Sequence, residues 1–289
     1  MTLKLNLSGT TMLHARSMLF VPGDRPDRMA KAARCGADAL ILDLEDAVVP
    51  GAKAAARAAI AAFLAEPRAQ KLFVRINPLD SGLADDDLAA ILPARPDGVV
   101  LPKALGGQTL AALDARLSGD VMILPIATET PAAIFGLGSY GGVTARLAGL
   151  TWGAEDLPAA IGATTARESD GRYTAPYQLA RSLTLFGAHA AGVAAIETVY
   201  PDFRDEAGLA AYAARARRDG FSGMMAIHPA QVAVINTAFT PVAEEIDHAR
   251  AIVALFAANP GAGALSLGGR MVDAPHLKAA EHLLAMAQK

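Results

Sequence analysis

Short apolar runs alternate with amphipathic, alanine-rich stretches along most of this chain. Each apolar run closes on a polar residue, a glycine or a proline, which is typical of strands buried on both faces of a parallel sheet. The pattern predicts eight strands, over residues 17–21, 39–42, 72–76, 98–101, 121–127, 147–152, 194–199 and 224–227. The stretches between and after them predict helices over residues 27–34, 53–64, 85–92, 108–117, 131–137, 177–190, 206–218 and 229–239.

Eightfold alternation of strand and helix in 289 residues predicts an α/β protein with a (β/α)₈ TIM barrel. A doubly wound open sheet is the alternative, but no Gly-x-Gly-x-x-Gly follows the first strand. The longest connection is 153–192, and its polar middle, 164–173, is expected to be a loop over the barrel mouth. Sequence alone favours neither a lid nor a solvated excursion for it.

The chain continues past the eighth unit. A helix is expected over about 242–257, then a Gly-rich break at 259–269, then a last helix to about residue 287. The predicted domains are therefore a barrel at 1–240 and a C-terminal helical extension at 241–289, which is amphipathic and needs a surface to pack on.

Composition indicates a globular protein with a sizeable core, because 53% of residues are hydrophobic and 19% are charged. The net charge of -3 lacks the excess of positive charge that is typical of nucleic-acid-binding proteins. No apolar run approaches the roughly 18 residues of a membrane span, and residues 1–9 do not resemble a signal peptide, so we expect a cytoplasmic enzyme. The single cysteine, Cys35, is expected to be a small core residue at the end of the first helix.

Polar side chains follow nearly every predicted strand, and in a barrel these positions face one another. They are Asp24 and Arg25, just after Pro22, following the first strand, Asp43, Glu45 and Asp46 after the second, Arg75 and Asn77 at the third, Lys103, Glu129, Glu155 and Asp156, Tyr200, and His228. So many carboxylates on one rim would repel one another without a cation. Mg²⁺ commonly takes one or two carboxylates, and Glu129 and Asp156, expected at an exposed rim on adjacent strands, are the first choice.

Two further rim residues have competing interpretations. Arg75 interrupts an apolar strand, so its charge needs a carboxylate partner such as Asp43 or Glu45, or an anionic substrate, which we favour. His228, before Pro229, could be a base or a metal ligand, but such a histidine more often donates a structural hydrogen bond. We expect it only to position its neighbours.

Several motifs, in order along nearly the whole chain, resemble the citrate lyase β-subunit family, which includes malyl-CoA and citramalyl-CoA lyases. They are SMLFVPG at 17–23, DLEDAV at 43–48, VRIN at 74–77, LPK at 101–103, Glu129-Thr130, GAEDL at 153–157, IHPAQ at 227–231 and MVDAP at 271–275. One small departure is Ala154, where the family is expected to have a bulkier hydroxyl residue.

The resemblance implies a TIM barrel assembled into trimers or hexamers, with the extension packed on a neighbouring subunit. It implies Mg²⁺ at Glu129 and Asp156, and Arg75 at the substrate carbonyl. The loop 20–28, with Phe20, Pro22 and Arg25, and the His228-Pro229 turn would contact a CoA thioester. Asp273 would be the acid/base on the acyl carbon. Asp43, Glu45, Asp46, Lys103 and Glu155 would support these groups.

These roles predict retro-Claisen cleavage of a 3-hydroxyacyl-CoA thioester to a 2-oxo acid and acyl-CoA. Mg²⁺ would polarise the hydroxyl, Arg75 would stabilise the enolate, and Asp273 would protonate it. The alternatives are a thioesterase on the same substrates, a citrate lyase subunit acting on an acyl-carrier-protein thioester, a CoA-independent pyruvate-type aldolase and a non-catalytic barrel. The intact Arg75, Glu129, Asp156 and Asp273 argue against the last.

Overall fold

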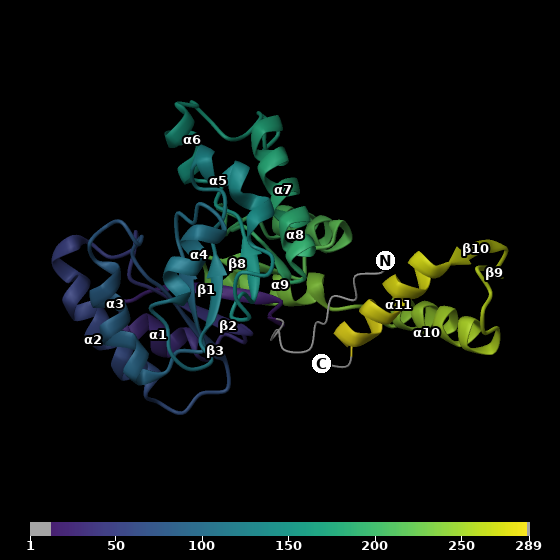
Figure 1. The fold of residues 1–289 in the computed structure, drawn as a ribbon, viewed down its shortest axis with the longest axis horizontal. Coiled ribbons are helices and arrows are strands. Elements are labelled where there is room, and N and C mark those ends of the chain that lie inside the picture. Colours follow the sequence, from purple (N-terminus) through teal and green to yellow (C-terminus); the bar gives the residue numbers. More distant parts are fainter. Residues whose placement is uncertain (1–12, 288–289) are drawn as a thin grey trace. The chain divides into compact units, whose positions relative to one another are not determined.

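A computed structural model describes residues 13–287. The residues on which the signal-peptide expectation rests, 1–9, lie outside this range. The chain divides into two compact units, Met1–Asn236 and Thr237–Lys289, which are described separately below (Figure 1).

The first unit is built on eight parallel strands in the sheet order β5-β4-β3-β2-β1-β8-β7-β6. The strands are β1 (Ser17–Pro22), β2 (Ala39–Asp43), β3 (Lys71–Arg75), β4 (Gly98–Leu101), β5 (Met122–Pro125), β6 (Gly149–Thr151), β7 (Ala194–Glu197) and β8 (Gly223–Ala226). Two isolated parallel bridges, Ile123 with Leu147 and Ile126 with Thr151, join the outermost strands β5 and β6. The sheet therefore closes into the predicted (β/α)₈ barrel, with a short and irregular seam between β5 and β6.

Helices follow the strands and surround the barrel, as the periodicity predicts (Figure 1). They are α1 (Pro26–Ala32), α2 (Lys53–Leu64), α3 (Ala84–Ile91), α4 (Gly107–Asp114), α5 (Pro131–Gly136), α6 (Asp156–Ile161), α7 (Ala175–Ala191), α8 (Glu206–Asp219) and α9 (Pro229–Phe239). Short 3₁₀ turns occupy η1 (Pro50–Ala52), η2 (Leu92–Ala94) and η3 (Leu137–Ser139).

Apolar side chains from alternate strand positions fill the barrel. Met18, Ile41, Phe73 and Met225 belong to one buried cluster, and each is at most 3% exposed. The Phe73 ring occupies the space beside Gly98, where a Cβ would lie 2.2 Å from the ring. Because both faces of the sheet are covered, the strands read as continuous apolar runs in the sequence.

Three local features differ from the sequence prediction. The long connection contains α6, which begins at Asp156 and was not predicted, and a hairpin in which Arg167 and Tyr173 pair. Helix α6 has only six residues, too few to give a clear amphipathic period. Cys35 lies after the end of α1 and is half-buried, so it is not a core residue.

The second unit consists of α10 (Ala243–Ala258), the antiparallel pair β9 (Ala264–Leu267) and β10 (Arg270–Asp273), and α11 (Ala274–Ala287). Only helices were predicted here. Gly268 and Gly269 both have positive φ, 58° and 79°, which a tight two-residue hairpin turn requires. Val272, Ile252, Ala249 and Ala280 form its small core.

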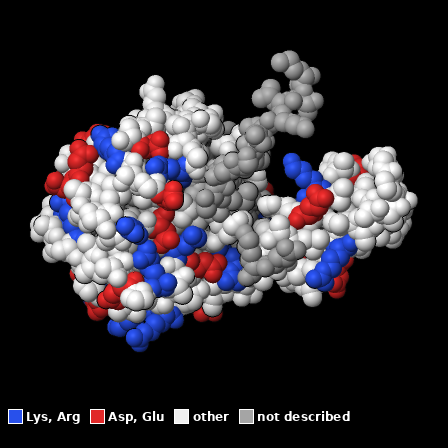
Figure 2. Space-filling model, turned by 60° about the horizontal axis from the view of Figure 1, so that its bottom comes forward, with Lys and Arg blue, Asp and Glu red and all other residues white. Residues whose placement is uncertain are grey.

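Basic and acidic side chains are interspersed on the face of the protein in Figure 2. Among the described residues, no helix is long and apolar enough to span a membrane.

Candidate functional site

The carboxyl ends of neighbouring strands bring part of the predicted rim set around one cavity of about 370 Å³: Pro22, Asp43, Asp46, Arg75, Glu129, Glu155 and Asp156. The residues that line it are Phe20, Pro22, Arg28, Asp43, Asp46, Ala47, Arg75, Ile126, Glu129, Gly153, Ala154, Glu155, Asp156, Thr198, Val199, Met225 and Ile227. Charged groups therefore occupy the β2, β3, β5 and β6 side, whereas the β7 and β8 side has no charged group and carries Thr198, Val199, Met225 and Ile227.

Arg75 ends β3 and is held by two carboxylates from the loop after β2. Its Nε and Nη2 donate to Asp43 Oδ1 and Oδ2 at 2.8 and 2.6 Å, and its Nη1 lies 2.9 Å from Glu45 Oε2. Burial works against the guanidinium charge, but these carboxylates outweigh it and raise the pKa of Arg75 above its ordinary value. A guanidinium has five N–H groups and hydrogen bonds to Asp43 use two of them, so N–H groups remain for a ligand. The predicted ion pairs and a substrate contact are therefore compatible.

A buried lysine that sequence reasoning missed holds the loop after β2. Lys53 is 9% exposed, and its Nζ donates to the carbonyls of Leu44 and Glu45 at 2.6 and 2.8 Å and to Asn77 Oδ1 at 2.8 Å. Lys53 is the first residue of α2, where a positive charge opposes the helix dipole. That unfavourable placement is the signal in the sequence that could have identified it.

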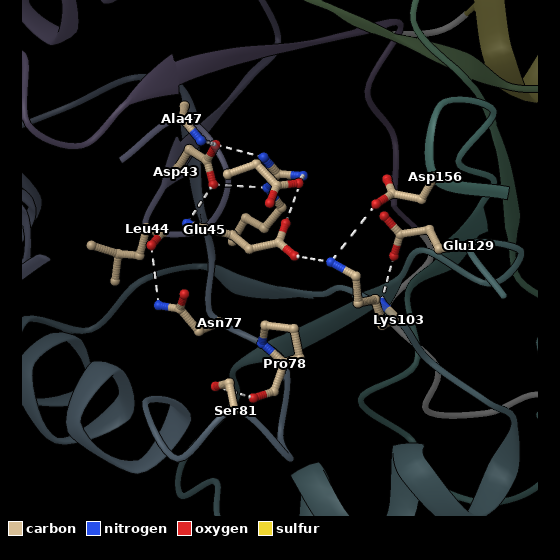
Figure 3. Close-up of polar contacts among 12 residues, drawn as sticks. Asp43, Leu44, Glu45, Ala47, Asn77, Pro78, Ser81, Lys103, Glu129 and Asp156 are labelled. Atoms are coloured by element: carbon tan, nitrogen blue, oxygen red, sulfur yellow. Dashed lines mark hydrogen bonds and ion pairs between the residues drawn. The ribbon is translucent and has the colours of Figure 1, made fainter. Parts of the chain in front are cut away.

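Lys103, after β4, connects Glu45 to both predicted metal ligands (Figure 3). Its Nζ lies 2.9 Å from Glu45 Oε1 and 3.8 Å from Asp156 Oδ1, and its backbone N–H donates to Glu129 Oε2 at 2.5 Å. Lys103 has φ +50°, a left-handed conformation that is uncommon outside glycine. This strained backbone conformation occurs at the residue whose N–H donates the hydrogen bond to Glu129.

Glu129 is 3% exposed, so the expectation of an exposed rim position is wrong for this carboxylate. The fold places it at the end of β5, just before α5, whose N-cap Thr130 accepts a hydrogen bond from the Ala133 N–H. Burial raises the pKa of Glu129 to about 8, and the neighbouring charges of Asp156 and Glu45 add to the shift. A cation beside Glu129 would therefore stabilise its ionised form.

Gly153 makes room for this carboxylate, so we expect Gly153→Ala to displace it. A Cβ at Gly153 would lie 2.7 Å from Glu129 Cγ, which is too close without a shift. A misplacement of about 1 Å can cost roughly 100-fold in rate, so Mg²⁺ affinity and kcat/KM should both fall sharply. The control is Gly138→Ala, where nothing lies within 4 Å of the added atom. Wild-type metal affinity in Gly153→Ala, measured by calorimetry, would contradict this arrangement.

The donor set fits Mg²⁺. Glu129 and the half-exposed Asp156 face the same cavity, and each offers hard carboxylate oxygens. Across residues 13–287, no group of three or more His, Cys, Asp or Glu side chains could hold a metal ion. Mg²⁺ commonly uses one or two carboxylates and keeps waters and substrate oxygens as its other ligands, so two suffice.

The raised pKa of Glu129 predicts a pH-dependent metal affinity. A ligand carboxylate must lose its proton to bind, so below pH 8 protons compete with Mg²⁺. We expect the apparent Kd for Mg²⁺ to rise about tenfold per unit as the pH falls below 8, and to level off above it. Calorimetry from pH 6 to 9 measures this, and a pH-independent Kd would show that Glu129 does not bind the ion as a carboxylate.

The structure places the other predicted residues as follows. Phe20 lies under the Arg75 guanidinium, with 4.9 Å from Cζ to the ring centre, and Pro22 lines the cavity. Arg25 instead pairs with Asp27 on the surface, and it is Arg28 that lines the cavity. On α1, Arg28 lies one helical turn after Arg25, and the sequence gives no means of choosing between them.

The contacts of the turn before α9 are with neighbouring residues of the fold. His228 Nδ1 accepts a hydrogen bond from the Ala230 N–H at 3.2 Å, and the ring stacks on Phe203 at 4.6 Å. The hydrogen bond is structural, as expected from the sequence, but His228 accepts it and does not donate it. Pro229 is the first residue of α9.

Asp273 belongs to the second unit, at the end of β10. Its Oδ1 lies 2.6 Å from His276 Nδ1, and this contact lowers the pKa of Asp273 below its ordinary value. The side chain is about one-third exposed, which leaves it accessible.

Comparison with known proteins shows similarity over nearly the whole chain. A family model described as HpcH/HpaI aldolase/citrate lyase matches residues 16–229. A citrate lyase subunit beta-like protein of Mycobacterium tuberculosis is 37% identical over 279 residues, which cover 93% of this chain and 94% of that protein. The mitochondrial citramalyl-CoA lyase of Mus musculus is 32% identical over 98% of this chain and 88% of its own.

A solved structure extends this similarity to three dimensions. CitE of Mycobacterium tuberculosis, in complex with magnesium, acetoacetate and coenzyme A, has a TM-score of 0.82 and 34% identity, covering 96% of this chain and 99% of that chain. The match includes the barrel and the C-terminal extension.

Proposed function

The chain belongs to the HpcH/HpaI aldolase/citrate lyase family, and from this premise we propose that it is a Mg²⁺-dependent carbon–carbon lyase. Its substrate would be a 3-hydroxydicarboxylyl-CoA thioester of the malyl-CoA or citramalyl-CoA type, and its products a 2-oxo acid and acyl-CoA. The observation that carries the proposal is one cavity in which a fixed guanidinium, Arg75, faces the two carboxylates Glu129 and Asp156. The magnesium, acetoacetate and coenzyme A bound by the CitE structure support this choice.

Each group has a defined task in the cleavage. Mg²⁺, held by Glu129 and Asp156, would supply Lewis-acid polarisation of the hydroxyl that becomes the 2-oxo group. Breaking the carbon–carbon bond leaves an electron pair on the thioester enolate, and the N–H groups of Arg75 that do not bond Asp43 are preorganised to bind that oxyanion. Lys53 and Lys103 act through other residues, because they hold Glu45 and the loop after β2 in place. The hydroxyl loses its proton as the carbon–carbon bond breaks, and Asp273, ionised because His276 lowers its pKa, would accept that proton and deliver it to the enolate carbon.

Turnover of malyl-, methylmalyl- and citramalyl-CoA with and without Mg²⁺ tests the proposal. A lyase forms a 2-oxo acid and an acyl-CoA and releases no free thiol. Thiol release without a 2-oxo acid would indicate a thioesterase. Turnover of free hydroxy-oxo acids would indicate a CoA-independent aldolase, and activity only with an acyl-carrier-protein thioester would indicate a citrate lyase subunit.

We also propose that the protein is a cytoplasmic trimer or hexamer in which Asp273 completes the site of a neighbouring subunit. Asp273 lies beyond all eight strand–helix units, in a unit with its own small core. A cyclic oligomer allows such an extension to serve the next barrel. The role rests on the family resemblance.

Mixed oligomers test this shared site. Glu129→Gln and Asp273→Ala should each be inactive alone. When the two are co-expressed, a barrel with intact Glu129 can use the intact Asp273 of its neighbour, which restores about a quarter of the sites in a random cyclic mixture. If Asp273 acts within its own chain, no mixed oligomer holds a complete site, so mixed oligomers without activity would reject the model.

A further inference from the structure

A second cavity in the first unit, of about 260 Å³, is rich in arginine and tyrosine. Arg167, Asp170, Gly171, Arg172, Tyr173, Tyr200, Gly208, Ala211, Tyr212 and Arg215 line it. It lies between the hairpin of the long connection and the first turns of α8. Tyr200 lines this cavity, and Val199, the residue before it, lines the cavity that contains Arg75 and Glu129, so the segment after β7 contributes to both.

The hairpin that carries two of these arginines is firmly anchored. Backbone hydrogen bonds run from Glu168 N to Arg172 O at 2.7 Å and from Thr174 N to Ala166 O at 2.9 Å. Tyr173 is 3% exposed and packs edge-on against Trp152 with ring centres 5.0 Å apart. The hairpin backbone is therefore ordered, and the buried Tyr173 holds the Arg167 guanidinium at 4.0 Å from its ring centre.

The charge of the cavity is unbalanced. Arg167 is held by Gly171 O and the Tyr173 hydroxyl at 2.9 and 2.7 Å, and Arg215 lies over the Tyr212 ring at 5.0 Å. In the described part of the chain, the contacts of these two arginines include no ion pair with a carboxylate. Arg172 is paired, with its Nε 2.7 Å from Asp170 Oδ2. Three guanidinium groups therefore meet one carboxylate.

We propose that this cavity binds a phosphoryl group. Guanidinium groups donate paired N–H bonds in the geometry that phosphate oxygens accept, and two unpaired guanidinium groups match the two charges of a phosphate. The phosphoryl group could belong to the nucleotide end of a CoA thioester bound next door, or to a free phosphate compound. The binding chemistry is the same in both cases.

Calorimetry with three probes separates these sources: CoA, pantetheine, which lacks the nucleotide phosphates, and inorganic pyrophosphate. The variants are Arg167→Gln and Arg215→Gln, and the control is Arg218→Gln, an exposed arginine of α8 that does not line the cavity. If the nucleotide phosphates bind here, each variant weakens CoA binding about tenfold, whereas pantetheine binding is unchanged. If a free phosphate compound is the ligand, pyrophosphate binding weakens instead and CoA binding is unchanged.

Two results would overturn the proposal. In one, both variants bind CoA and pyrophosphate as the wild type does. In the other, CoA and pantetheine binding fall equally, which would mean that the variants disturb the neighbouring cavity. Because binding is measured without turnover, the result does not depend on the lyase reaction.

Discussion

Replacing Glu129 with glutamine will abolish both Mg²⁺ binding and carbon–carbon cleavage. The amide keeps the shape of the side chain and can still accept the Lys103 N–H, but it removes the buried anionic ligand. Mutation of a residue that only hydrogen-bonds to a metal ligand typically lowers metal affinity by about 10–100-fold. Loss of the ligand itself should therefore lower Mg²⁺ affinity by more than about 100-fold. Calorimetric titration with Mg²⁺ and assays of acyl-CoA release measure the two effects. Wild-type Mg²⁺ affinity in this variant would reject Glu129 as a ligand.

The stability of the same variant distinguishes a lost ligand from a damaged fold. The pKa of Glu129 is about 8 in the folded state and about 4.5 when unperturbed, so its ionisation opposes folding above pH 4.5. Without metal, Glu129→Gln should therefore have a higher Tm than the wild type. The difference should grow from pH 4.5 to about 8 and then stay constant. Glu66→Gln, at an exposed position after α2, is the control and should change neither property.

Arg75→Lys will lower kcat by about 100- to 1,000-fold with a smaller change in KM. Lysine keeps the charge but cannot pair with both oxygens of Asp43 and also present N–H groups to the enolate. Enolate charge develops only along the reaction path, so the loss falls on kcat, by the amount typical of one missing oxyanion donor. Steady-state kinetics with the CoA thioester measure both constants.

A matched variant separates this effect from the loss of an ion pair. Arg16 makes the same two-pronged contact with Asp38, both at 2.9 Å, at the opposite ends of β1 and β2. Arg16→Lys should reduce stability without lowering kcat. If Arg75→Lys changes only KM, the guanidinium holds the ground-state substrate and does not stabilise the enolate.

The barrel was predictable because its strands are buried on both faces. Runs such as 39–42 and 98–101 contain no polar residue, and the polar residues that follow them mark the ends that meet at the site. The hairpin of β9 and β10 was not predicted, since its strands have four residues each, and only β9 alternates between exposed and half-buried side chains. Periodicity over so few residues is weak.

The candidate site was predictable only in part. Position after a strand was enough to suggest Asp43, Arg75, Lys103, Glu129 and Asp156, and the structure brings them together. Lys53 begins a helix and reaches back to the preceding loop, a tertiary contact that no local pattern encodes. The burial of Glu129 depends on Gly153 from the next strand, so its raised pKa could not be inferred from the chain around it.

The seam between β5 and β6 gives the proposed metal a mechanical role. Every other pair of adjacent strands shares a continuous ladder, whereas β5 and β6 are joined by isolated bridges. Glu129 follows β5 and Asp156 follows β6. An ion bound by both would therefore link the two strands that are joined only by isolated bridges. Thermodynamic reciprocity then applies: a change that loosens the seam weakens metal binding, and the bound ion resists opening of the seam by the same free energy. In this protein, the ion that activates the substrate would also stabilise the closed barrel at the seam between β5 and β6.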